Sequence, residues 1–166
     1  MNIIIGNIIS LFAASLMVVC GYIKSRKKTL AVQSVQISFC VLSNIFLGGI
    51  SGVIINLISL PRNLLAYKDK LNITWKIILC ILSIMFTLMF DATLLLKYLP
   101  IVSNTLYTFL IDKLDDVKFK WLLICTSVLW GIYDICLLNY VMFVFDIGCI
   151  VTSLIAIVRL KNKILN

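Results

Sequence analysis

Histidine and glutamate are absent from this chain, and proline occurs only twice in 166 residues. Histidine and glutamate are the commonest general bases and metal ligands, so their absence excludes most membrane-enzyme and metalloenzyme chemistries. We therefore expect no enzyme activity, no metal site and no cofactor. The six cysteines all lie in apolar segments without CxxC spacing, which favours buried packing over disulfides or metal binding.

Long polar segments are also missing, because 62% of the residues are hydrophobic and the mean hydropathy is +1.11. A membrane-spanning helix needs about 20 apolar residues. The apolar runs predict an all-α membrane protein with seven transmembrane helices and only turns between them. The expected spans are residues 3–23, 29–48, 50–67, 75–96, 99–113, 119–138 and 141–160.

The 15 basic residues gather in every second gap between these spans. The first, third and fifth gaps and the C-terminal tail carry 13 of them, one lies in the fourth gap, and Arg62 lies just inside a span. Basic residues near membrane crossings stay in the cytoplasm. The alternation therefore predicts an outside N-terminus and a cytoplasmic C-terminus.

The formal charge of +8 does not indicate a nucleic-acid partner. The basic residues are spread over short gaps next to the membrane, whereas nucleic-acid binding concentrates them on one face. We expect them to set the topology and to contact lipid headgroups, so membrane lipids are the predicted partners.

Three weak internal matches occur in the same order along the chain. The start of the first span matches the start of the fifth, with Asn7 over Asn104. CVLSNIF from Cys40 matches SVLWGIY from Ser127, and the ends of the third and seventh spans place Arg62 over Arg159.

This repetition explains why a fourth span lies between the two matching sets of three. A directly fused copy of three spans would be inverted, and one additional crossing restores its orientation. We predict two parallel three-helix repeats, residues 1–68 and 98–166, joined by a linker transmembrane helix in residues 69–97. Repeats of this kind place a binding site near the bilayer midplane at their interface.

The arrangement of three, one and three helices resembles the SWEET sugar transporters and the wider PQ-loop superfamily. Within it, the chain is most similar to the YgjV-type bacterial inner-membrane family. The segments that carry the likeness are GGISGVIINLISLPRNLLAYK from Gly48 to Lys68 and VLWGIYD from Val128 to Asp134. The Pro-Gln pair of the superfamily is missing, so the resemblance implies architecture more than substrate.

Three aspartates lie inside expected spans, although an Asp at a helix centre costs about 2.5–3.5 kcal/mol to insert. Asp91, Asp134 and Asp146 all belong to the outer halves of their spans, as do Asn7 and Asn104. We interpret these five residues as a polar, proton-responsive vestibule. The alternative is that the aspartates only reach interfacial water at the ends of the helices.

A solute site is predicted nearer the midplane, where an amide can bind hydroxyls while an aromatic ring covers an apolar face. Its candidate residues are Asn56, Trp130, Tyr133 and Ser153. The resemblance to SWEET-like proteins implies this role for Asn56 and Trp130 only. Hydrogen bonding between helices and core packing are the alternative explanations.

Arg62 follows Pro61 where the third span leaves the membrane, and snorkelling to headgroups would account for both Arg62 and Arg159. A gate built from Pro61 and Arg62 is the alternative. The favoured function is a transporter or facilitator for a small polar, sugar- or metabolite-like solute. The rival is a non-transporting accessory or scaffold membrane protein, which would have a dry and closed core.

Overall fold

The computed structural model describes residues 2–91 and 95–165, and within them every regular element is a helix. The helices are α1 (Ile3–Tyr22), α2 (Arg26–Leu47), α3 (Ile50–Tyr67), α4 (Ile73–Phe90), α5 (Tyr98–Leu110), α6 (Asp116–Cys136) and α7 (Tyr140–Leu165). The predicted all-α architecture and the seven helices are therefore present.

Local sequence signals explain where several helices begin and end. Gly48 adopts a left-handed conformation after α2 (φ 75°), which lets the chain reverse at once into α3. The side chains of Asn72 and Asp115 accept hydrogen bonds from the first turns of α4 and α6. Such N-caps satisfy backbone donors that a helix start leaves free.

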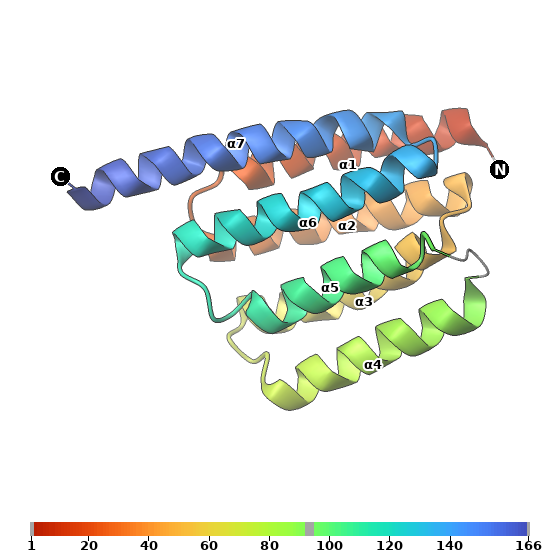
Figure 1. The fold of residues 1–166 in the computed structure, drawn as a ribbon, viewed down its shortest axis with the longest axis horizontal. Coiled ribbons are helices and arrows are strands. Elements are labelled where there is room, and N and C mark those ends of the chain that lie inside the picture. The colour runs from red at the N-terminus through yellow and green to blue at the C-terminus, as the bar shows by residue number, and fades with distance from the viewer. Residues whose placement is uncertain (1, 92–94, 166) are drawn as a thin grey trace.

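Successive helices run in opposite directions, so the bundle has two ends (Figure 1). We call the end that carries the N-terminus and the α2–α3, α4–α5 and α6–α7 links the N-terminal face. The opposite end, with the other three links and the C-terminus, is the C-terminal face. Helices α1 and α5 run in the same direction, as do α2 and α6, and α3 and α7 (Figure 1).

Six helices form a closed ring, and α4 lies outside it. Contacts between neighbours run from α1 to α2, α3, α5, α6 and α7, and α7 contacts α1 again. Helix α4 packs only against the outside of α3 and α5 within these contacts, and it forms one edge of the molecule in Figure 1. The helix expected to be a linker is thus peripheral.

Two expected spans differ from the observed helices. Six helices are long and apolar enough to cross a membrane, but α5 has only 13 residues. At 1.5 Å per residue it is about 20 Å long, against about 30 Å of bilayer hydrocarbon. The fourth helix ends at Phe90, so placing Asp91 inside a span was wrong: Asp91 is the C-cap of α4.

An apolar cluster fills the ring near the C-terminal face. Its buried members include Leu30, Tyr107, Ile111 and Phe119. Large hydrophobic side chains also cover the outside of the bundle, as expected for helices that face lipid. The ring therefore closes toward the C-terminal face on side chains from both predicted repeats.

Candidate solute cavity

A cavity of about 90 Å³ lies inside the ring. A water needs roughly 10–15 Å³ of such space, so the cavity has room for several waters. The lining comes from all six ring helices and the α6–α7 link, and no described residue of α4 belongs to it. Its polar or aromatic members include Gln33, Gln36, Ser43, Asn44, Asn56, Ser59, Arg62, Ser103, Asn104, Tyr107, Thr126, Ser127, Trp130, Asp134, Asn139 and Asp146.

Two buried carboxyl groups face each other toward the N-terminal end of the cavity. Asp134 on α6 and Asp146 on α7 are close enough to interact electrostatically, and Asp134 accepts a hydrogen bond from Asn139 (3.1 Å). Among the described residues, no protein donor reaches either oxygen of Asp146. An ionised carboxylate only accepts hydrogen bonds, so the pair can bond directly only when one member carries a proton.

A buried guanidinium lies deeper in the cavity. Arg62 is 4% exposed, and its Nη1 donates to Oδ1 of Asn104 at 2.6 Å. Its Nε and Nη2 donate to Oδ1 of Asn63 at 3.1 and 2.9 Å, and it stacks 4.5 Å from the ring centre of Tyr107. Snorkelling to headgroups was therefore the wrong expectation for Arg62, because the amides hold its side chain inside the ring.

The amides around Arg62 are oriented by its donors. A guanidinium only donates, so Asn63 must turn its oxygen to Arg62 and its Nδ2 away from Arg62. That Nδ2 donates to Oε1 of Gln33 (3.2 Å), which also accepts from the hydroxyl of Tyr107 (2.7 Å). The acceptors of Asn63 and Gln33 are thus occupied, while the Nε2 of Gln33 remains a donor on the cavity wall.

Hydrogen bonds close the N-terminal end of the ring between the predicted repeats. The hydroxyl of Tyr133 on α6 accepts from the backbone N–H of Gly52 and from Oγ of Ser51 on α3, both at 2.9 Å. The carboxylate of Asp91 accepts from the backbone N–H of Ser51 at 3.1 Å. We call the contacts of Tyr133 with Ser51 and Gly52 the tyrosine latch.

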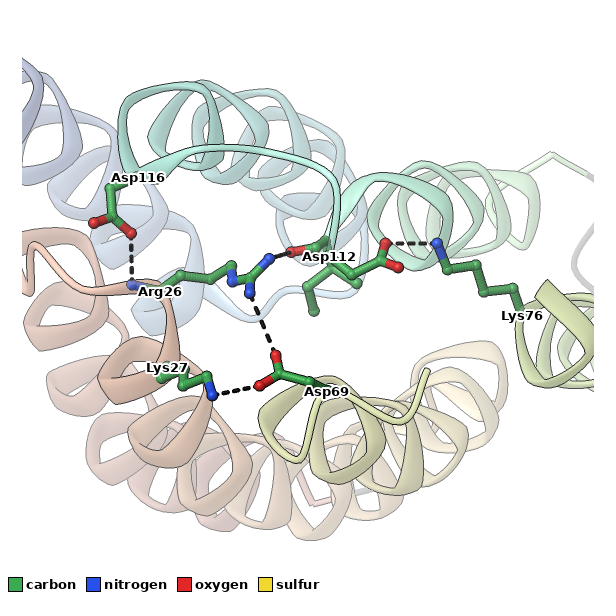
Figure 2. Close-up of polar contacts among 7 residues, drawn as sticks. Arg26, Lys27, Asp69, Lys76, Asp112 and Asp116 are labelled. Atoms are coloured by element: carbon green, nitrogen blue, oxygen red, sulfur yellow. Dashed lines mark hydrogen bonds and ion pairs between the residues drawn. The ribbon is translucent and has the colours of Figure 1, made fainter. Parts of the chain in front are cut away.

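Charged side chains link the two repeats across the C-terminal face, and Arg26 at the start of α2 is their centre (Figure 2). Its backbone N–H donates to Asp116 of α6 (3.0 Å), and its guanidinium donates to the Ile111 carbonyl (3.1 Å) and pairs with Asp69 (3.6 Å). Lys27 also pairs with Asp69 (2.5 Å). We call these contacts the arginine hub.

Two carboxyl groups at this face have pKa values below their usual range. The hydrogen bond from Lys27, with the nearby charges of Lys27 and Arg26, lowers the pKa of Asp69. The backbone N–H of Lys118 lowers the pKa of Asp115, the N-cap of α6. Both carboxylates are therefore ionised at neutral pH, and the pairs at Asp69 are intact there.

The predicted site residues separate into those that line the cavity and those that do not. The cavity lining includes Asn56, Trp130, Asp134, Asp146, Asn104 and Arg62. Residues outside the lining are Asn7, Pro61, Asp91, Tyr133 and Ser153.

Those outside have other contacts. Asn7 bonds to Leu138 and Val141 and so ties α1 to the α6–α7 link. Ser153 is fully buried, and Pro61 lies exposed on the outside of α3. The ring of Tyr133 meets Trp130 edge-on at 5.5 Å, so the latch residue positions an aromatic side chain that does line the cavity.

The two glutamines on the polar face of α2, Gln33 and Gln36, were not predicted from the sequence. Gln33, Gln36, Cys40 and Asn44 recur at helical spacing and all line the cavity. The aspartates were identified as polar side chains inside apolar runs, and the same criterion would have found Gln33 and Gln36. Nothing local in the sequence marks Arg26 as the centre of a hub, because its partners come from distant segments.

In the described part of the chain, no three His, Cys, Asp or Glu side chains gather closely enough to hold a metal ion. The Imp-YgjV family model, described as bacterial inner membrane protein, matches residues 4–164. The chain belongs to the Imp-YgjV family. No curated protein and no solved structure matches it.

Membership of the Imp-YgjV family places this multi-pass helical protein in the bacterial inner membrane. It covers nearly the whole chain, so the ring, the cavity and the contacts at both faces all belong to the family region. Because the bundle lies in a bilayer, the ring helices separate its cavity from the lipid, and α4 adds a second layer outside α3 and α5.

Proposed function

We propose that this Imp-YgjV protein is a transporter or facilitator that moves a small polar, sugar- or metabolite-like solute through the ring. The observation that carries the proposal is one cavity, with many polar side chains in its lining, that touches Asn56, Trp130 and Asp146 together. A scaffold protein needs no such space, and buried polar groups in a bilayer are costly unless they serve a site or a pathway.

The ring order supports a two-repeat organisation of the SWEET-like kind. Exchanging α1, α2 and α3 for α5, α6 and α7 leaves the order of neighbours around the ring unchanged. Each exchanged pair also runs in the same direction, as parallel repeats require (Figure 1). Helix α4 then serves only to return the chain to the N-terminal face.

Contacts at the two faces give this organisation a mechanism. The tyrosine latch joins the repeats at the N-terminal face, and the arginine hub joins them at the C-terminal face. Rocking of one repeat against the other would break one set while the other holds. The excess of basic residues at the C-terminal face orients that face toward the cytoplasm.

The carboxyl pair gives the proposed transporter a proton-responsive group. A proton shared by Asp134 and Asp146 holds α6 against α7, and its loss leaves two negative charges side by side. Solute movement would then depend on pH, and Asp146→Asn would remove that dependence while it retains a side chain of similar shape.

The test is uptake by the purified protein in proteoliposomes, with a broad panel of labelled sugars, polyols, organic acids and amino acids. Asp146→Asn and Asn56→Ala should reduce uptake, whereas Ile147→Ala and Leu57→Ala, on neighbouring exposed positions, should not. Absence of uptake for every compound, with both site variants as stable as the wild type, would refute the proposal.

A further inference from the structure

The surroundings of Arg62 point to the chemical class of the solute. We infer that the cavity binds a solute through a carboxylate, and that the guanidinium of Arg62 is its partner. This inference rests on the proposed function and narrows it. It also makes a prediction about binding alone, which can be tested without transport.

Arg62 is a buried cation without a protein anion. Within the described residues, no carboxylate lies within ion-pairing distance of its guanidinium, and its hydrogen-bond partners Asn63 and Asn104 are neutral. A buried charge is costly unless it is paired. Buried Lys76, by contrast, has a carboxylate at 2.5 Å, from Asp112. Lys120 is also buried without an acid, but it lies outside the cavity lining.

Donors exceed acceptors at this point of the cavity wall. Arg62 carries five N–H groups, and three of them make the hydrogen bonds described above, so two remain. The nearby Nε2 of Gln33 adds further N–H donors, since its Oε1 already accepts from Asn63 and Tyr107. The Oδ1 atoms of Asn63 and Asn104 and the Oε1 of Gln33 already accept from protein donors. A ligand group that fits these donors must accept hydrogen bonds and carry negative charge.

The acids of the cavity do not supply that charge. The tyrosine latch places Gly52 of α3 at the same height along the bundle axis as Tyr133 of α6, which precedes Asp134 in the sequence. From Gly52 to Arg62, helix α3 rises roughly 15 Å. The carboxyl pair and the guanidinium are therefore toward opposite ends of the cavity, and a solute carboxylate can approach Arg62 without meeting Asp134 or Asp146.

A carboxylate suits this site because a guanidinium binds its two oxygens side by side. Two sources of the group fit equally: a small organic acid, or an amino acid whose ammonium group faces the acidic end. A neutral carboxamide has almost the same shape but lacks the charge. Pairs of acid and amide therefore test the inference directly.

The experiment measures binding to the purified protein in nanodiscs by calorimetry and by thermal shift. The probes are acetate, lactate, alanine and succinate, each compared with its carboxamide. At least one acid should bind about tenfold or more tightly than its amide. Binding of alanine over lactate would identify the amino-acid source, and the reverse would identify the organic-acid source.

Three variants assign the binding to the guanidinium. Arg62→Gln should abolish the preference for the acid, and Arg62→Lys should weaken binding while keeping the charge. Arg159→Gln is the matched control, because Arg159 is the repeat counterpart of Arg62 and is exposed beside Tyr22. It should bind as the wild type does.

Asn104→Asp keeps the inference testable even if Arg62→Gln does not fold. It places a carboxylate where Oδ1 of Asn104 already accepts from Arg62. The internal ion pair should raise the melting temperature and abolish solute binding. If no acid binds the wild type, or if Asn104→Asp binds acids as well as the wild type does, the inference is overturned. If the protein takes up only neutral solutes, the carboxylate inference is overturned and the proposed transport function stands. If it binds carboxylates but takes up no solute, the proposed transport function is overturned and the carboxylate inference stands.

Discussion

Replacing Tyr133 with phenylalanine tests the tyrosine latch most directly, because it removes one oxygen and keeps the ring. Tyr133 is 1% exposed, and its ring contact with Trp130 does not depend on the hydroxyl. The substitution removes two hydrogen bonds of 2.9 Å, from Ser51 and from Gly52. It creates no large cavity, so hydrogen bonding dominates the expected effect.

The magnitude follows from what each donor can do afterwards. Hydrogen bonds between membrane helices average about 0.6 kcal/mol, which is the expected loss for the bond from Ser51. Ser51 can turn its hydroxyl to another acceptor. The backbone N–H of Gly52 lies in the first turn of α3, where no intrahelical acceptor exists, so it stays unpaired at a further cost of about 1–3 kcal/mol. We expect Tyr133→Phe to lower the free energy of unfolding by about 2–4 kcal/mol.

Equilibrium unfolding in mixed micelles measures this loss, with Tyr140→Phe as the control because Tyr140 is exposed at the start of α7. The control should change stability by less than about 0.5 kcal/mol. The double variant Ser51→Ala/Tyr133→Phe should be less destabilised than the sum of the single variants, because both remove the same bond. A loss below about 0.5 kcal/mol for Tyr133→Phe would refute the latch as a stabilising contact.

Two further predictions concern the C-terminal face. Asp69→Asn should lower the melting temperature at neutral pH, because it removes the ion pairs of Asp69. The folded protein lowers the pKa of Asp69 below its ordinary value of 3.8. The ion pairs therefore stabilise the fold fully above pH 3.8, and this stabilisation is lost as the pH falls through the lowered pKa. The difference from wild type should therefore vanish in strong acid, and a difference that persists there would contradict the assignment. Asp112→Asn should destabilise the protein by about 2–3 kcal/mol because it leaves buried Lys76 unpaired, whereas Lys76→Met should cost less than about 1 kcal/mol, since Asp112 is partly solvated. The same unfolding assay measures both variants. If Asp112→Asn and Lys76→Met lower the free energy of unfolding equally, the burial of Lys76 is not the cause of the expected difference.

The sequence by itself determined the helices, because apolar runs of spanning length and a few capping residues decide them locally. It also marked Asn56, Asp134 and Asp146, which line the cavity, since polar groups inside apolar runs are costly and mark a special environment. Trp130 was indicated only by the resemblance to SWEET-like proteins. Span ends were less certain: the chain leaves the helix at Asp91 although the apolar pattern continues beyond it.

Only the tertiary structure decided which polar residues meet. Asn7 and Asn104 occupy matching places in the repeat, yet Asn104 binds Arg62 in the cavity while Asn7 ties together two helix ends. Arg62 and Arg159 differ in the same way. The physical reason is that a side chain's role depends on which neighbours the packing brings within about 3 Å, and those neighbours come from segments far apart in the chain.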